Sequence, residues 1–207
     1  MRILAALIAG LLAATPALAG DLAVSLKTSS GKPVTDAVVM VTPQGGSPAP
    51  RSAGSYRMAQ QGMQFQPFVL IVPVGADVAF PNFDPVLHHV YSFSAAKPFE
   101  LKLYGRDQSR RVRFDKAGVV AVGCNIHDAM SAFIRVVDTA HAVKTDAAGA
   151  AVLAGLPAGP AILTVWHPYL KGARNETVRT IAIPAAGVAR QALVVDLRAP
   201  PMRHGPY

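Results

Sequence analysis

The stretch Val119-Val-Ala-Val-Gly-Cys-Asn-Ile-His-Asp-Ala-Met-Ser-Ala-Phe-Ile-Arg-Val-Val137 contains the single cysteine of the 207-residue chain, Cys124. His127 follows three residues later, and Met130 three residues after that. Apolar, β-branched runs flank these side chains on both sides, which predicts a turn between two strands. A thiolate, an imidazole and a thioether would then lie on one short loop.

Donors of this kind indicate a copper ion rather than a hard cation, because thioether sulfur suits copper and contributes little to zinc, magnesium or calcium sites. Zinc is an alternative, but it would leave Met130 without a role. The set lacks a second imidazole, and Leu87-His-His-Val-Tyr-Ser-Phe93 offers His88 and His89. Adjacent residues of a strand point to opposite faces, so only one of the two can face the metal. Alternation alone does not decide which.

The predicted centre is one mononuclear copper ion, with Cys124 and two histidines in plane and Met130 as a weak axial ligand. Sulfur donors favour the reduced ion and imidazole accepts either oxidation state, so this set suits a one-electron carrier. A copper-binding protein for storage or delivery without a redox role is the alternative. An enzyme with Cys124 as nucleophile and His127 as base is disfavoured, because no third residue is evident to orient the base. We therefore expect no enzymatic activity.

The N-terminus predicts export to the periplasm. Residues 1–19 have the form of a cleaved signal peptide, with Arg2, an apolar run from Ile3 to Ala14, and Ala17-Leu-Ala19 before the cleavage point. The mature protein would begin at Gly20 without membrane insertion. An unpaired cysteine in an oxidising compartment needs protection, which binding to a metal would provide.

The charge balance points to a protein partner. Lys and Arg number 20 against 12 Asp and Glu, a formal net charge of +8, and +7 remains when Arg2 is removed. In an exported protein this favours an acidic redox partner protein or an anionic surface over nucleic acid. The densest basic run, 106–113, is ordinarily a solvated face, with partner docking as the minority alternative. Phe83, Pro85 and Met130 are candidates for an apolar collar through which a histidine edge exchanges electrons.

The distribution of glycine, proline and short apolar runs along the chain predicts an all-β fold. Gly and Pro, 17 of each, are spread throughout, and the apolar runs are short. The segment 154–159 reads as a turn because it contains two glycines and a proline. Residues 199–207 are Pro-rich and are expected to be a disordered tail. Strands are expected at 22–26, 37–41, 68–74, 77–80, 99–104, 112–114, 119–124, 161–166, 178–183 and 192–197.

Four motifs stand out between residues 64 and 137: Phe65-x-Pro67, Val72-x-x-Gly75-x-x-Val78-x-Phe80-x-Asn82, a histidine before Val90, and Gly118-x-x-x-x-x-Cys124-x-x-His127-x-x-Met130. With these motifs the segment resembles the cupredoxins, the small blue copper proteins of the plastocyanin and amicyanin group. In that family the upstream ligand is a histidine followed by Asn and then Val. The resemblance therefore implies His88, Cys124, His127 and Met130 as the metal ligands. His89 stands where the family has Asn, a residue that ties the two ligand-bearing segments together.

Longer phrases, such as Gly123-Cys-Asn-Ile-His-Asp128, look like periplasmic plastocyanin-like proteins of the "methylamine utilization protein" type. That likeness gives no reason to infer methylamine metabolism.

The remaining segments contain the phrases Gly31-Lys-Pro-Val-Thr-Asp-Ala-Val-Val39, Thr145-Asp-Ala-Ala-Gly149 and Leu156-Pro-Ala-Gly159. With these phrases they resemble the carboxypeptidase regulatory-like β-sandwich. The implied architecture is a cupredoxin Greek-key β-sandwich at 55–138, inserted into a second small β-sandwich made of 21–45 with 139–198. A cupredoxin at 20–138 followed by a small β module is the alternative layout.

Overall fold

The structure, a computed structural model, describes residues 19–51 and 54–200. These residues form β-strands and one short 3-10 helix, Ala173–Asn175, so the all-β prediction is confirmed. Within the described ranges, no helix has the length and apolar character needed to cross a bilayer. The predicted signal peptide, except Ala19, and residues 201–207 of the predicted tail lie outside the described residues.

The middle of the chain forms two sheets around one core. A five-stranded sheet has the order β6-β12-β11-β8-β9, and a three-stranded sheet has the order β10-β7-β3. A short hairpin, β4-β5, lies beside them. Buried side chains from both sheets, among them Phe80, Val90, Phe114 and Ile134, form the core between them. The strands are β3 (Tyr56–Arg57), β4 (Ala59–Gln60), β5 (Phe65–Gln66), β6 (Val69–Pro73), β7 (Ala76–Pro81), β8 (His88–Ser92), β9 (Phe99–Tyr104), β10 (Ser109–Phe114), β11 (Gly118–Cys124) and β12 (Ser131–Val137).

The two ends of the chain together form a second pair of sheets. One sheet has the order β14-β1-β17, with β1 parallel to β17, and the other has the order β13-β2-β15-β16. Their shared core contains buried side chains from both ends, such as Leu22, Val39, Leu163 and Leu193. The strands are β1 (Ala19–Thr28), β2 (Val38–Pro43), β13 (Ala142–Lys144), β14 (Ala150–Pro157), β15 (Gly159–Trp166), β16 (Glu176–Ile183) and β17 (Val188–Val195).

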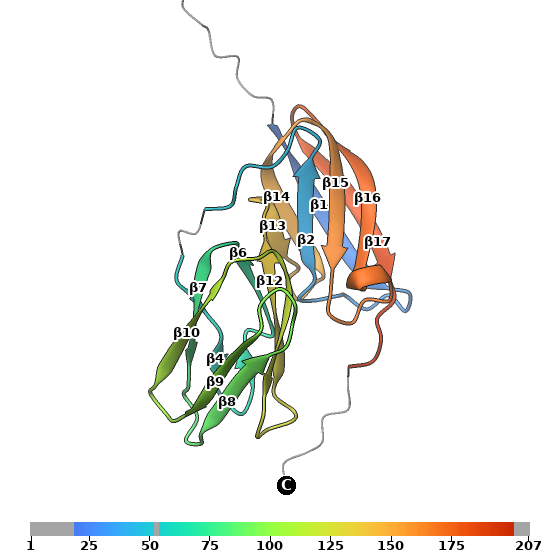
Figure 1. Ribbon diagram of the computed structural model, residues 1–207. Helices are drawn as coiled ribbons and strands as arrows, with labels where there is room; N and C mark the ends of the chain where they lie inside the picture. Colours follow the sequence, from blue (N-terminus) through green and yellow to red (C-terminus); the bar gives the residue numbers. More distant parts are fainter. Residues whose placement is uncertain (1–18, 52–53, 201–207) are drawn as a thin grey trace, which may run out of the picture.

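The two groups of sheets meet through a third buried cluster, which joins Val69 and Val137 to Val38, Met40 and Trp166. At the same contact Arg135 on β12 forms an ion pair of 2.9 Å with Glu176 at the start of β16. Figure 1 shows β12 ascending from the lower group of strands to the upper one, where the chain continues into β13. One strand therefore links the ligand-bearing loop to the boundary between the two groups.

The alternation of inward and outward side chains along β8 and β11 places His88 and Cys124 on the core side of the sheet. On β11, Val120, Val122 and Cys124 are buried. On β8, His88 and Val90 are buried, whereas His89 lies on the opposite face. The strands pair directly, with Cys124 opposite Val90. The ends of two neighbouring strands thus carry His88 and Cys124 toward the same core.

The prediction of a turn over the whole of 154–159 is wrong, because β14 continues to Pro157 and β15 begins at Gly159, which leaves only Ala158 between them. Gly155 has φ of +66°, and Leu156 is fully buried opposite Gly20 on β1. The register of the β1–β14 pair shifts between Gly20 and Leu22. This irregularity accommodates Gly155, and β14 stays paired with β1 on both sides of it. Tertiary pairing with β1 overrides the local turn signal.

Candidate metal centre

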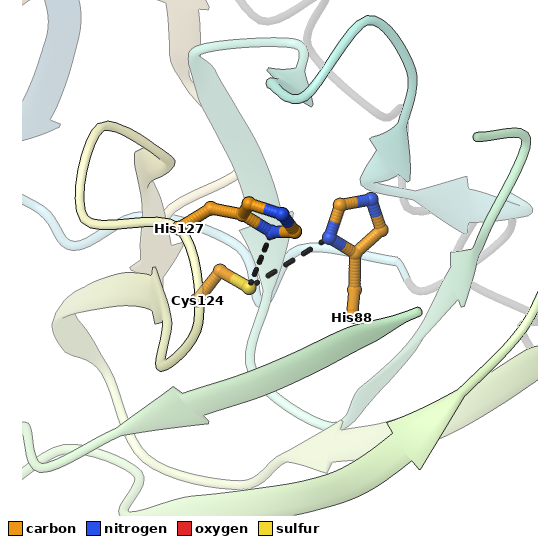
Figure 2. A group of neighbouring side chains, drawn as sticks. All are labelled: His88, Cys124 and His127. Atoms are coloured by element: carbon orange, nitrogen blue, oxygen red, sulfur yellow. Dashed lines mark hydrogen bonds between the residues drawn. The ribbon is translucent and has the colours of Figure 1, made fainter. Parts of the chain in front are cut away.

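Three of the four predicted ligands come together in the described residues. One donor atom from each of His88, Cys124 and His127 lies within 4.8 Å of the other two. His88 and Cys124 are buried, and His127 is half-buried. Figure 2 shows both imidazole rings turned toward the sulfur of Cys124.

The spacing fits one metal ion. The Cys124 Sγ lies 3.7 Å from His88 Nδ1 and 3.6 Å from His127 Nδ1. An ion about 2.3 Å from sulfur and about 2.05 Å from nitrogen would hold these atoms about 3.6 Å apart at a tetrahedral angle and about 3.8 Å apart at a trigonal one. The two imidazole rings, with centroids 5.0 Å apart and planes at 66°, do not stack face to face. The spacing therefore fits one metal ion, and a donor set of two imidazoles and one thiolate is that of a blue copper site.

The loop from Cys124 to Met130 is closed by its own backbone. The Met130 N–H donates to the His127 carbonyl at 2.9 Å, and the Cys124 N–H donates to the Met130 carbonyl at 3.2 Å. The Met130 side chain is only 2% exposed and belongs to the same buried cluster as Cys124. A long axial contact between the Met130 thioether and the metal stays a prediction.

His89 makes a separate contact on the outer face of the sheet, where its Nε2 lies 2.8 Å from Oε1 of Glu100. The Asn125 N–H donates to the His89 carbonyl at 3.0 Å, so the backbone joins the two ligand-bearing segments. His167 is buried in the second group of sheets, where its Nδ1 accepts the Tyr169 N–H at 3.2 Å. Neither His89 nor His167 belongs to the three-residue cluster.

His88 is held from behind by Asp84, a residue to which the sequence assigned no role. Its Nε2 lies 2.8 Å from Asp84 Oδ2, and both side chains are almost fully buried. Burial, with a smaller contribution from His127, lowers the pKa of His88 more than the carboxylate beside it raises that pKa, which favours the neutral ring. Burial alone would raise the pKa of Asp84, but hydrogen bonds from His88, Met63 and Gly62 more than offset it and lower that pKa. The contact therefore joins a carboxylate to a neutral imidazole.

Asn82 shapes the loop that leads to His88. Its side-chain amide donates to the carbonyls of Val86 at 2.9 Å and Tyr104 at 3.1 Å, and its Oδ1 accepts the Asp84 N–H at 2.8 Å. Asn82 is fully buried. A signal for these supporting residues was present in the sequence, since Asp84 precedes His88 by four residues across a Pro-containing turn.

A scan of the chain against models of known protein families finds no match, and neither does a search of curated proteins. Among solved structures, the chain is similar to a copper-containing nitrite reductase from Thermus scotoductus SA-01, with 28% identity over 41% of this chain and a TM-score of 0.39. The chain covers only 22% of that reductase. It is also similar to a purple cupredoxin from Nitrosopumilus maritimus, with 20% identity over 40% of this chain and 100% of that one, at a TM-score of 0.37. An amicyanin in its Cu(I) form gives 20% identity over 48% of this chain and 98% of that one, at a TM-score of 0.37.

Proposed function

We propose that this chain is a periplasmic one-electron carrier that holds a single type 1 copper ion. The observation that carries the proposal is the convergence of one sulfur and two imidazole nitrogens, with Sγ–Nδ1 distances of 3.7 and 3.6 Å. Copper bound there would supply the one-electron couple. The side chains of His88 and Cys124 are buried on rigid strand ends, so they would hold nearly the same geometry in both oxidation states.

The choice of copper over zinc rests on the fourth donor. Met130 is buried on the same loop and shares the hydrophobic cluster of Cys124. A thioether is a good partner for copper and a poor one for zinc. We propose Met130 as the axial ligand, which completes the set of His88, Cys124, His127 and Met130.

Electrons would leave through His127, which is half-buried whereas the other ligands are buried. Its neighbour Ile126 is 47% exposed, and an apolar loop with Phe83, Val86 and Leu87 exposed leads into His88. These four side chains form the apolar rim of the site. The buried Met130 does not belong to this exposed surface, in contrast to the collar expected from the sequence. A small apolar patch of this kind suits a brief encounter with a redox partner.

The charge beside the apolar rim supports an acidic partner protein. Arg106 lies in an exposed turn held against the site loop, because the Asp107 N–H donates to the Asn82 carbonyl at 2.8 Å. Arg110 is exposed on β10 and lies over the Tyr104 ring, 5.5 Å from its centroid. Positive charge next to an exit point for electrons accelerates encounters with a negatively charged surface.

We also propose a layout of two units, with the copper-binding unit at 55–138 inserted into a sandwich made of 21–45 and 139–198. The support is the strand pairing, since β1 and β2 pair with strands from the C-terminal part of the chain. Export rests on the signal-like sequence of residues 1–19.

The test is the absorption and electron spin resonance spectrum of the purified mature protein after addition of Cu(II). We expect an intense thiolate-to-copper band and rapid electron exchange; colourless, labile Cu(I) binding would instead favour storage or delivery. His88→Ala should abolish the band, whereas the matched variant His89→Asn should preserve it. The reverse result would transfer the ligand role to His89.

A further inference from the structure

The turn between β4 and β5 presents two backbone N–H groups to one buried carboxylate. Gly62 and Met63 have φ of +66° and +52°, and the Gln61 N–H donates to the Gln64 carbonyl, as in a tight hairpin turn of the primed type. The Gly62 N–H donates to Asp84 Oδ1 at 2.6 Å, and the Met63 N–H donates to Oδ2 at 3.0 Å. Two converging backbone donors make a small anion-binding site that favours the ionised carboxylate.

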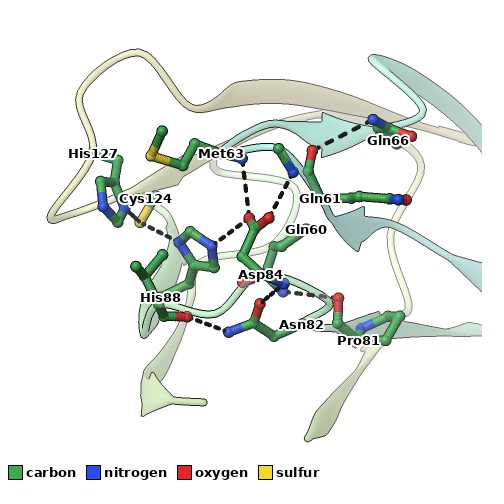
Figure 3. A network of polar contacts seen from close by, with 12 residues as sticks. Gln60, Gln61, Met63, Gln66, Pro81, Asn82, Asp84, His88, Cys124 and His127 are labelled. Carbon is green, nitrogen blue, oxygen red and sulfur yellow. Dashed lines mark hydrogen bonds and ion pairs between the residues drawn. The ribbon is translucent and has the colours of Figure 1, made fainter. Parts of the chain in front are cut away.

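The same carboxylate has one more partner, the ring of His88. Oδ2 of Asp84 lies 2.8 Å from His88 Nε2, while the other ring nitrogen, Nδ1, faces the Cys124 sulfur at 3.7 Å. In Figure 3 the carboxylate of Asp84 lies between the turn and the ring, and the ring lies between the carboxylate and Cys124. An ionised carboxylate can only accept hydrogen bonds, so Nε2 must carry the proton and Nδ1 must present its lone pair.

From this chain of contacts we propose that Asp84 is a positioning residue for the metal ligand His88: it fixes the Nε2–H tautomer, aims Nδ1 at the metal and places a buried negative charge behind the ring. The inference rests on the proposed copper function for its redox consequence, but the tautomer belongs to the metal-free protein as well. Carboxylate partners of this kind orient metal-bound histidines and make them better donors.

The chain offers a matched control. Glu100 makes a contact of the same length, 2.8 Å, with the neighbouring His89, but it lies on the exposed outer face of the sheet. Glu100→Gln therefore removes one negative charge from a histidine that does not belong to the metal cluster. Asp84→Asn removes the same charge and keeps the shape of the side chain. However, the NH2 group of the new Asn would replace one carboxylate oxygen. In place of Oδ1 it would face the Gly62 N–H, and in place of Oδ2 it would face the Met63 N–H and the His88 ring, so two donors would meet in either orientation.

The first measurement is nitrogen-15 NMR of the metal-free wild type near neutral pH, with two-bond correlations to the ring protons of His88. We expect the Nε2–H tautomer. An Nδ1–H tautomer would overturn the proposal, and this result depends neither on copper binding nor on the folding of any variant. If the wild type shows the Nε2–H tautomer but binds no copper, the proposed function fails, whereas the orientation of the His88 ring by Asp84 stands.

The second measurement compares the copper proteins. Asp84→Asn should weaken Cu(II) binding about 10–100-fold, the usual effect of removing such a partner, and Glu100→Gln should leave it unchanged. Because the lost charge stabilises Cu(II) more than Cu(I), the reduction potential of Asp84→Asn should rise. A tenfold greater loss for Cu(II) than for Cu(I) corresponds to about 59 mV. Equal affinities and potentials in the two variants would refute the role of Asp84.

Discussion

Replacement of Asn82 by Ala should lower the free energy of unfolding of the protein, because Asn82 holds the loop before His88. The substitution removes three hydrogen bonds: two buried ones, to the Tyr104 carbonyl and the Asp84 N–H, and a part-buried one to the Val86 carbonyl. Each of these bonds contributes about 1 kcal/mol net, so the free energy of unfolding should fall by about 3 kcal/mol. In a chain of this size that loss corresponds to a decrease in Tm of about 6–12 °C.

The assay is thermal unfolding of the metal-free protein followed by circular dichroism, so that metal binding does not add its own stabilisation. Asn125→Ala is the control, because Asn125 is exposed and only its backbone N–H, which the substitution retains, bonds to His89. It should change stability by no more than about 0.5 kcal/mol. If Asn82→Ala loses no more than this control, the hydrogen bonds of Asn82 do not hold the loop.

Three other predictions concern the ligands and a buried histidine. Cys124→Ser should abolish the intense charge-transfer absorption of the copper protein; survival of the colour would show that another group supplies it. Met130→Gln should retain copper and lower the reduction potential, and an unchanged potential would argue against axial coordination. Burial lowers the pKa of His167 from 6.5 to about 4, so the unfolded state binds more protons between these values and stability should fall as pH decreases from 6.5 to 4, by roughly 3 kcal/mol in all. His167→Gln should flatten the dependence of Tm on pH in that window, and parallel curves for variant and wild type would contradict this assignment.

The proposed ligands are readable from the sequence because their chemistry is local. Cys124, His127 and Met130 occupy one short loop, and strand periodicity places Cys124 on the inner face once the register is known. Strand alternation left His88 and His89 open, and the resemblance to the cupredoxins selected His88. The pairing of β8 with β11 then places His88 on the core side of the sheet, together with Cys124.

The position of Asp84 four residues before His88 was a signal in the sequence, but the role of Asp84 was not readable because its other partners are distant in the chain. Asp84 depends on N–H groups from the turn at 62–63, about twenty residues earlier, and on the unusual φ angles of that turn. A lone Asp next to Pro85 looks like an ordinary turn residue. The error at 154–159 has the same origin, because only the pairing with β1 shows that Leu156 is a core residue.

The close approach of β2 and β13 has a consequence for engineering. These strands pair in antiparallel fashion, with Met40 opposite Ala142 and Val38 opposite Lys144, although about a hundred residues separate them in the chain. The metal-binding segment thus departs and returns at neighbouring points, as a hairpin loop does, and long insertions at such points cost little closure entropy. We expect that a short linker between Pro43 and Ala142 would leave the remaining strands able to fold as a host scaffold, into which other modules could be grafted.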